Sequence, residues 1–499
     1  MPTEIRRWDS DRTRLALVYL VTLPFTLPMF RMYFTGDDAG NVYYYVQRSH
    51  WQALYNNLFF WTSFRRPLAG LVYLVLYDVF GFTYPLPYYL TGFVVFSVNL
   101  SLLYWLFVRL TGNGFLAAIA TAVASVHQEI ADVWYNFGAL YELLAFCGIM
   151  AGFHFYLSFL EAPAGPRRKR LYWATLAAYV LAINGKEVAV VFPALLLAYE
   201  VVYRIRWQTI GPMLRQVLAR LVPFFAVAGV CTAGKTLGSE ALWRDNPLYR
   251  YHFDGTLIEN LRGYIEVAFL RNLSISAGHL TLVLAVALAL ALLLRSRHMV
   301  FGWLYFLIAL LPVLGLPRVW GLFLYIPLVG LALYLTSLLF ELGSLVGASF
   351  LSFFMPRWEL RRQTAWLALA AMLVLLGVFH YGRFFEAVDK LFLAPAQERA
   401  IFAHQLFARF PELPDRAGLL ILNSPLEDWT LHMTIWLHYA ESGIHVFGGP
   451  NLNVKDFPEI ARDLPEAHAL DYRDRKLEEL SMEELKAGVR LQGSGIRER

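Results

Sequence analysis

Long apolar runs separated by short polar loops follow one another through most of this 499-residue chain. A helix that crosses a bilayer needs roughly 20 apolar residues, or fewer where the span is short or broken. That measure predicts about 11 spanning helices, over residues 13–34, 86–109, 112–127, 137–160, 171–184, 187–203, 216–236, 277–295, 299–316, 320–341 and 364–383. The pattern therefore predicts an all-α polytopic membrane module over residues 1–383.

Basic residues gather in alternate loops of this arrangement, as they do in cytoplasmic loops. With the N-terminus inside, the inner loops hold Arg109, then Arg167, Arg168, Lys169 and Arg170, then Arg204, Arg206 and Arg215, then Arg295 and Arg297, and then Arg357, Arg361 and Arg362. The first apolar run reads as a retained signal-anchor, because no small-residue cleavage site follows it. We expect an integral protein of a bacterial inner membrane, with a cytoplasmic N-terminus and a periplasmic C-terminal part.

Two apolar segments do not fit this scheme as spans. A span over residues 67–80 would move Arg109 and the cluster Arg167–Arg170 to the outer face and break the pattern, and residues 261–276 carry three charged side chains. We interpret the first segment as a juxtamembrane or re-entrant helix at the outer surface, and the second as a similar helix.

The composition changes at about residue 384, where charged residues become common. Gly418–Leu422 and Ile444–Phe447 read as short strands, and Trp429–Tyr439 reads as an amphipathic helix between them. The charged stretch Asp471–Lys486 is expected to be helical. Residues 384–499 are therefore predicted to form a small extracytoplasmic α/β domain.

The overall composition supports a membrane protein, with 58% hydrophobic residues, 16% charged residues and a mean hydropathy of +0.47. A soluble domain of this size could not bury that much apolar surface. The net charge of +5 does not indicate nucleic-acid binding, because the basic residues lie in short loops between apolar runs. Cys147 and Cys231 lie in apolar stretches and define neither a disulfide framework nor a metal-binding spacing.

An acidic pair opens the first predicted outer loop. Asp37 and Asp38 suit the N-cap of a helix expected over Tyr43–Trp51. A carboxylate at that place would also suit a general base for an acceptor hydroxyl. Both interpretations can hold, because one Asp can cap while the other faces a pocket. The aromatic residues of this loop, Tyr44 among them, offer faces on which a sugar could stack.

Basic side chains predicted on the same outer face are candidates for holding a phosphate group. They are Arg65, Arg66, Lys186 and Arg318. For the arginine pair the alternative is an anchor that extends to the membrane surface. For Lys186 it is an ion pair with the adjacent Glu187.

His127 and Glu129 follow the third predicted span, and could orient an acceptor or hold a divalent ion, although their spacing is not diagnostic of a metal site. Glu142 lies a turn inside the next span, where an unpaired carboxylate is costly. We expect it to bond to a neighbouring helix. No cofactor is expected.

Six short motifs follow one another in the chain: Phe34-Thr35-Gly36-Asp37-Asp38, Ser63-Phe64-Arg65-Arg66-Pro67-Leu68, Val126-His127-Gln128-Glu129-Ile130-Ala131, Asn184-Gly185-Lys186-Glu187, Asp245-Asn246-Pro247 and Leu324-Tyr325-Ile326-Pro327. In this order they resemble motifs of membrane glycosyltransferases of the C-type fold, which use polyprenyl-phosphate-linked sugars. The transmembrane O-mannosyltransferases with C-terminal tetratricopeptide repeats are the most similar group. The likeness covers about residues 13–340 and departs at Leu140-Tyr141-Glu142, where that group has an arginine and an aspartate. No such repeat follows here, so the acceptor stays open.

The resemblance implies an inverting transfer, in which an acceptor hydroxyl attacks the anomeric carbon and expels a polyprenyl phosphate. That reaction needs a base at the nucleophile and positive charge on the leaving phosphate. We therefore expect Asp37 to act as the base, with Asp38 as the alternate and Glu129 close by. The phosphate would contact Arg65, Arg66, Lys186 and Arg318, and the acceptor would be oriented by His127, Glu142, Glu187 and Tyr44.

The expected partners are a polyprenyl-phosphate sugar and a protein, glycan or lipid acceptor within the membrane environment. Two other classes stay open. One is a transporter or flippase of lipid-linked sugars, and the other is a non-catalytic partner in assembly of the cell envelope.

Overall fold

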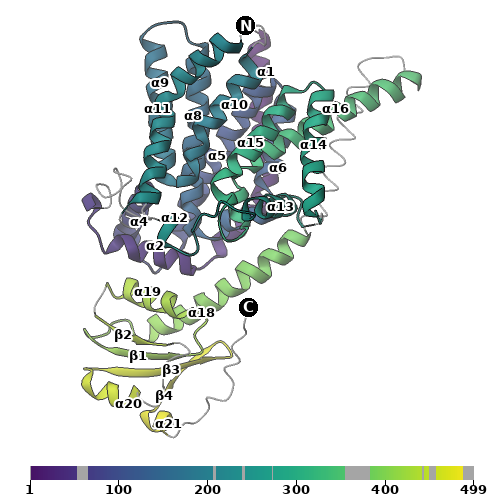
Figure 1. Cartoon of the computed structure of the whole chain (residues 1–499). Coiled ribbons are helices and arrows are strands. Elements are labelled where there is room, and N and C mark those ends of the chain that lie inside the picture. The colour runs from purple at the N-terminus through teal and green to yellow at the C-terminus, as the bar shows by residue number, and fades with distance from the viewer. Residues whose placement is uncertain are drawn as a thin grey trace.

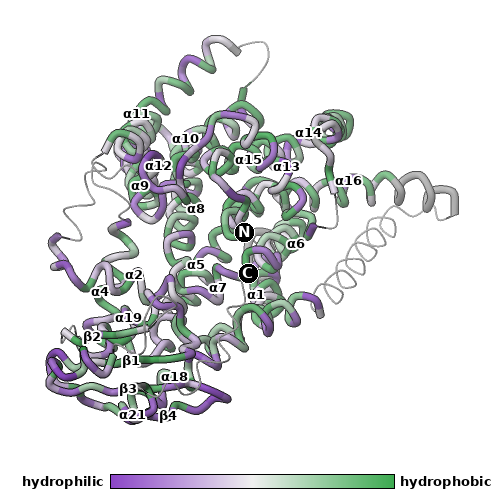
Figure 2. Tube along the Cα trace, turned by 60° about the horizontal axis from the view of Figure 1, so that its bottom comes forward, coloured by the Kyte–Doolittle hydropathy of each residue, from purple (hydrophilic) through white to green (hydrophobic). Residues whose placement is uncertain are grey.

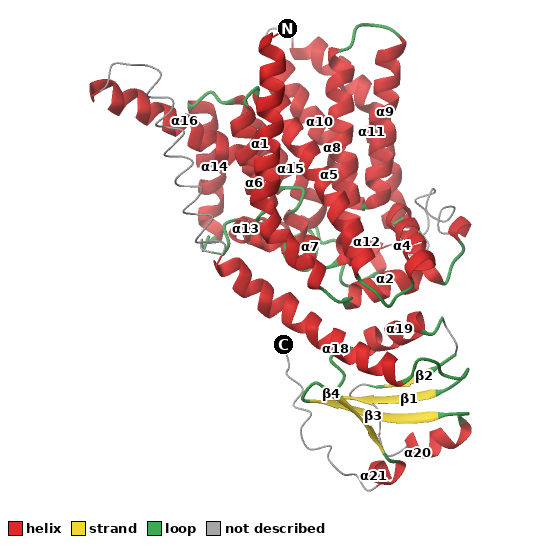
Figure 3. Ribbon diagram, turned by 180° about the vertical axis from the view of Figure 1, so that it is seen from behind, coloured by secondary structure: helices red, strands yellow, loops and turns green. Residues whose placement is uncertain are grey.

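Helices make up the membrane module, and all described strands lie in a separate C-terminal layer (Figures 1 and 3). The computed structural model describes residues 2–52, 66–205, 210–238, 242–271, 274–354, 382–440, 443–448 and 457–486. The predicted combination of a helical polytopic membrane module with a small C-terminal α/β unit is confirmed. Figure 2 shows hydrophobic residues along the bundle helices and hydrophilic residues gathered over the sheet.

The first half of the module runs from α1 to α11. Its helices are α1 (Pro2–Thr26), α2 (Gly36–Val46), α4 (Pro67–Phe80), α5 (Leu86–Thr111), α6 (Gly114–Ser125), α7 (Asp132–Tyr135), α8 (Leu140–Glu161), α9 (Pro166–Gly185), α10 (Phe192–Tyr199) and α11 (Ile210–Leu237). Short turns interrupt it at η1 (Leu27–Arg31), η2 (Gln128–Ile130), η3 (Phe137–Ala139), η4 (Glu187–Val191) and η5 (Glu200–Arg204).

The second half runs to α16. It contains α12 (Leu242–Asp245), α13 (Thr256–Ala268), α14 (Ala277–Leu293), α15 (Arg297–Leu314), the turn η7 (Gly321–Leu324) and α16 (Leu328–Phe354). The predicted outer helix over residues 67–80 is α4, and the second predicted outer helix lies earlier than expected, as α13. The segment 364–383 lies almost wholly outside the described residues.

Within the described residues, six helices are long and apolar enough to cross a membrane. A seventh would be the bent pair Gly114–Ser125 and Gln128–Tyr135, whose two parts meet at 61°. Several other predicted spans are helical but shorter, so the number of spans stays a prediction.

The bundle is held by close packing between its helices. α8 packs on α5 and α9, and α15 packs on α16. Where α15 meets α16, a Cβ on Gly302 would lie only 2.6 Å from the carbonyl oxygen of Gly330. Small residues at such crossings let two backbones approach closely, which is how membrane helices gain packing energy.

The C-terminal sheet has four strands in the order β2-β1-β3-β4. They are β1 (Gly418–Leu422), β2 (His445–Phe447), β3 (Ala467–Arg473) and β4 (Lys476–Leu480). β1 pairs in parallel with β2 and β3, and β3 pairs with β4 antiparallel. α18 (Ala394–Arg409) and α19 (Asp428–His438) cover the face toward the bundle, while α20 (Phe457–Ile460) and α21 (Met482–Lys486) lie on the other face (Figure 1).

Alternating residues of β1 build the two small cores of this unit. Leu419 and Ile421 pack with the α18 and α19 side, and Leu420 packs with Phe457 and Leu485 on the other. Successive side chains of a strand point to opposite faces, which explains the division. The predicted strands and the helix between them are confirmed. The domain boundary at residue 384 stays a prediction.

The expected helix over Asp471–Lys486 is wrong, because most of that stretch forms a β-hairpin. Asp474 and Arg475 have φ values of 47° and 64°, and Arg473 pairs with Lys476 across the turn. Two central residues with positive φ make the tight turn that matches the twist of paired strands. Burial of Leu470 and Leu477 against the sheet core outweighs the helix preference of the charged residues.

Candidate functional site

The ionisable residues singled out in the sequence lie mainly at one end of the bundle, the end that faces the C-terminal sheet. Figure 1 shows α2, α4 and α13 at this end and the N-terminus at the other. The chain here consists of short helices and 3-10 turns rather than continuous spans. Such breaks let polar side chains from distant segments meet above the apolar bundle.

Asp38 is part of the start of α2 and is fully buried, with 0% exposure. The true N-cap is Thr35, whose hydroxyl accepts the amide of Asp38, while the Asp38 carboxylate accepts the amide of Thr35 at 2.7 Å. Its other oxygen accepts the Gly138 amide at 2.6 Å, and the Tyr89 hydroxyl donates to the oxygen that accepts the Thr35 amide. The prediction of an Asp N-cap for a helix starting at Tyr43 is therefore wrong. The helix starts seven residues earlier, at Gly36, with a capping box formed by Thr35 and Asp38.

Asp37 is exposed to solvent, in contrast to its neighbour. Its carboxylate accepts a hydrogen bond of 3.0 Å from the side-chain amide of Asn136. Asn136 is held in turn, since its oxygen accepts the Gly138 amide. Asp37 thus offers an oriented, accessible carboxylate, and Asp38 holds the segment that carries it.

Arg66 begins α4 and is buried, with 5% exposure. Its guanidinium donates two hydrogen bonds to the Glu187 carboxylate, of 3.1 and 2.8 Å, in the fork geometry that suits a carboxylate. The guanidinium also lies 4.5 Å from the centre of the Tyr141 ring. The backbone of Arg66 is bonded to the Tyr45 hydroxyl at both its N–H and its carbonyl.

Lys186 pairs with Glu142 and not with its neighbour Glu187. The predicted alternative of a local Lys186–Glu187 pair is wrong, because the two side chains point to different partners on α8 and α4. Lys186 also lies 4.7 Å from the centre of the Phe323 ring. The expectation that Glu142 bonds to a neighbouring segment is confirmed.

A short chain of contacts joins Asp37 to these ion pairs. Asn41, one turn after Asp37, accepts a hydrogen bond of 2.9 Å from the Tyr141 hydroxyl. The Tyr141 ring lies under Arg66, and Glu142 follows Tyr141 directly. The exposed carboxylate and the buried charge cluster therefore share one short path of side chains.

His127 caps the turn η2 and has both ring nitrogens engaged. Nδ1 accepts the Glu129 amide at 3.3 Å, and Nε2 lies 3.0 Å from the Ala268 carbonyl. The Glu129 carboxylate lies 3.9 Å from the Arg271 guanidinium and beside Gly321 of η7. Among the described residues, no group of three His, Cys, Asp or Glu side chains is arranged to hold a metal ion.

Two other predicted site residues, both among those that the structure describes, lie apart from these contacts. Arg318 is exposed and stacks 4.0 Å from the Trp320 ring, and the Tyr44 ring lies under the Arg48 guanidinium at 3.8 Å. Arg65 lies outside the described residues.

Sequence reasoning missed Asn136, Tyr141 and Lys235 as site residues. Lys235 is buried near the end of α11, within electrostatic range of Glu187 and Arg66. A lysine late in an apolar run is a signal that could have found it. Asn136 and Tyr141 carry no such signal, because their roles depend on contacts across the fold.

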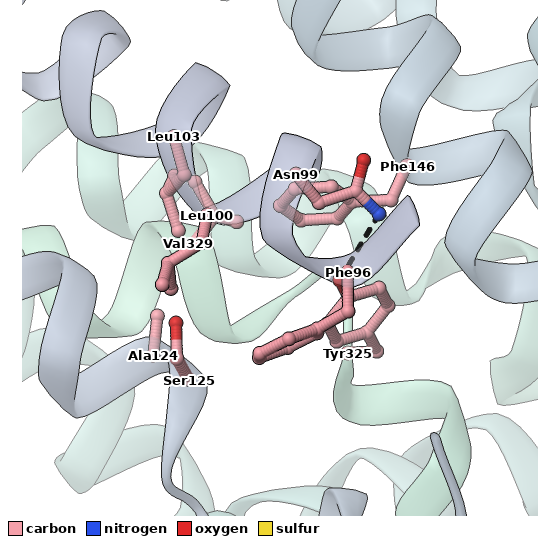
Figure 4. A pocket seen from close by; sticks show the side chains of 9 residues that line it. All are labelled: Phe96, Asn99, Leu100, Leu103, Ala124, Ser125, Phe146, Tyr325 and Val329. Atoms are coloured by element: carbon pink, nitrogen blue, oxygen red, sulfur yellow. Dashed lines mark hydrogen bonds between the residues drawn. The ribbon is translucent and has the colours of Figure 1, made fainter. Parts of the chain in front are cut away.

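A separate small pocket lies inside the bundle, between α5, α6, α8 and the segment leading into α16 (Figure 4). Its lining is mostly aromatic and aliphatic, and Asn99 donates there to the Tyr325 hydroxyl at 3.3 Å. The acidic and basic residues described above are not among its lining residues. It therefore belongs to the packing of the bundle rather than to the charged site.

No protein-family model and no curated protein matches this chain. Solved structures similar to it include two of the same protein. One is the crystal structure of ArnT from Cupriavidus metallidurans in the apo state, with a TM-score of 0.46, 16% identity and coverage of 94% of each chain. The other is ArnT from the same organism bound to undecaprenyl phosphate, with a TM-score of 0.44, 14% identity and coverage of 93% of each chain.

Proposed function

We propose that this chain is an integral-membrane inverting glycosyltransferase that moves a sugar from a polyprenyl-phosphate donor to an acceptor hydroxyl. The reaction would take place at the end of the bundle that carries α2, on the extracytoplasmic side. The observation that supports this most directly is an exposed, oriented carboxylate, Asp37, on the helix whose Asn41 is linked through Tyr141 to a buried cluster of charged side chains.

Asp37 suits the role of base. The acceptor oxygen would attack the anomeric carbon, its proton would pass to the Asp37 carboxylate, and the bond from carbon to phosphate oxygen would break. A base must lie within hydrogen-bond reach of the proton that it takes, so it has to be accessible. Asp38 is buried, and both of its carboxylate oxygens accept backbone amides. It therefore holds the segment that carries the base and does not act as the base itself.

The charge cluster suits the leaving phosphate. Three buried cations, Arg66, Lys186 and Lys235, lie with two buried carboxylates, Glu142 and Glu187. The excess positive charge favours an anion nearby, and it acts strongly where water is excluded. Lys186 carries three N–H donors, of which Glu142 takes one.

A transporter of lipid-linked sugars is the less well supported alternative. Transporters commonly place their ionisable residues near the bilayer midplane. The charged groups described here gather at the end of the bundle beside α2 (Figure 1).

The test is sugar transfer by the purified protein in nanodiscs with a panel of polyprenyl-phosphate sugars. Wild type is expected to release the sugar from one donor, and Asp37→Asn is expected to lose at least about 100-fold in rate. Asp78→Asn is the matched control, since Asp78 is an exposed aspartate of α4 whose partner is His50. Full activity of Asp37→Asn would remove Asp37 as the base. Binding of a donor without any turnover would favour the transporter alternative.

A further inference from the structure

The C-terminal domain is seated directly on the helix that carries Asp37. The indole ring of Trp429, at the start of α19, lies across Gly36 and Gly40 of α2 (Figures 1 and 3 show the two helices side by side). A Cβ added at either glycine would lie 2.9 Å from that ring, closer than real Cβ atoms come to their neighbours. The two glycines therefore form the seat of Trp429.

Further contacts bind the same two parts of the chain. The rings of Tyr43 and Trp436 lie 5.4 Å apart, again between α2 and α19. The Tyr77 hydroxyl donates to the Leu437 carbonyl at 2.9 Å, which ties the end of α19 to α4. The domain thus contacts the helix of the acidic pair and the helix that Arg66 begins.

The opposite side of α2 is held by the bundle. Asp38 accepts the Gly138 amide, and Asn41 accepts the Tyr141 hydroxyl. α2 is therefore held between the bundle and α19. Asp37 lies between Gly36, under the Trp429 ring, and Asp38, so the direction of its carboxylate depends on how both sides hold the helix.

We infer that Trp429 is a positioning residue for Asp37. Its ring packs on Gly36 and Gly40 and holds α2 in place, so the C-terminal domain contributes to the site. As far as catalysis is concerned, this rests on the proposed function. The structural part of the inference, that α19 holds α2 in place, rests on the contacts alone.

The experiment compares full-length wild type with Trp429→Leu, Gly40→Ala and the double variant, using hydrogen exchange of peptides that cover residues 36–46. Alanine favours helix over glycine, so Gly40→Ala by itself should slow exchange in α2 if the Trp429 ring played no part. We expect it to speed exchange instead, because the new methyl group meets the ring. Trp429→Leu should speed exchange of α2 on the order of tenfold, and Gly40→Ala should add nothing in that background.

The matched control is Gly229→Ala, because Gly229 is a helical glycine of α11 with open space where its Cβ would be. It should leave exchange of α2 unchanged. If Trp429→Leu leaves exchange of α2 at the wild-type rate, or if Gly40→Ala slows exchange in both backgrounds, the inference is overturned.

The catalytic part is read from kinetics on the donor that wild type uses. Trp429→Leu should lower kcat on the order of 10- to 100-fold with an unchanged KM for the donor, since small displacements of a reacting group cost that much. Unchanged kcat beside faster exchange would overturn the positioning role. If wild type transfers no sugar at all, the proposed function fails, and the exchange data still decide whether α19 holds α2.

Discussion

Two adjacent aspartates have opposite environments in this protein. Asp38 is buried and accepts two backbone amides and a tyrosine hydroxyl, whereas Asp37 is exposed and bonded to Asn136. In a helix, neighbouring side chains point about 100° apart, so one can face the bundle while the next faces solvent. One residue can therefore support the helix while the next remains available for chemistry.

Asp38→Asn should lower stability, while Asp37→Asn should not. An amide nitrogen cannot accept a backbone N–H, so one of the Thr35 and Gly138 amides would lose its partner. A buried donor left without a partner costs about 1–3 kcal/mol. Thermal unfolding of the purified variants measures the difference, with the exposed Asp37→Asn expected within about 0.5 kcal/mol of wild type. Equal melting temperatures for the two variants would contradict the structural role of Asp38.

The same residue should give the protein a pH-dependent stability. Burial raises the pKa of the Asp38 carboxyl from its ordinary value of 3.8 to about 6. Because the folded state then binds the proton more tightly than the unfolded state, the stabilisation is complete below pH 4 and is lost as the pH rises through 6. Unfolding midpoints between pH 4 and 7 should fall with pH more steeply in wild type than in Asp38→Asn. Parallel curves would exclude Asp38 as the titrating group.

At the scale of elements, ion pairs join segments that are far apart in the chain. Arg66 at the start of α4 pairs with Glu187 of η4, and Lys186 pairs with Glu142 of α8. Each of these four side chains is at most 6% exposed. Buried charges are tolerated when paired, so the pairs determine how α4, α8 and η4 meet at this end of the bundle.

Removing one partner of the Arg66–Glu187 pair should destabilise the protein more than replacing both partners with apolar residues. Arg66→Met or Glu187→Leu alone leaves an unpaired buried charge and should destabilise by roughly 3–5 kcal/mol, whereas the double variant should recover most of that loss. Unfolding of the three variants tests this, and additive losses would contradict it. If Arg66 also meets the donor phosphate, the double variant should regain stability but not transfer activity.

The elements also show where sequence patterns succeed and fail. The apolar strand β1 is a local signal and was predicted with its observed bounds, whereas α2 was predicted to start seven residues too late, with an aspartate instead of Thr35 as its N-cap. The β3–β4 hairpin was missed, because its charged residues favour a helix locally. Only pairing of β3 with β1, which is far away in the chain, makes that stretch a strand.

At the scale of the whole molecule, the N-terminus and the loop between α8 and α9, which leads into the basic first turn of α9, lie at the end opposite the C-terminal domain (Figure 1). The positive-inside rule then predicts that the two ends face different compartments. In a background without Cys147 and Cys231, Ala164→Cys in the α8–α9 loop should react with a membrane-impermeant thiol reagent only from the cytoplasmic side. Glu412→Cys in the C-terminal domain should react only from outside. Labelling of both from one side would overturn the orientation.

The sequence by itself determined the membrane character, most helices of the bundle, the α/β nature of the last domain and most ionisable residues of its candidate site, although not Lys235. These follow from local hydrophobicity, residue type and the cost of charge in an apolar span. Only the tertiary structure decided which carboxylate is exposed, which cation pairs with which carboxylate, and that α19 rests on α2. Those features depend on contacts between residues far apart in the chain, and no local pattern contains them.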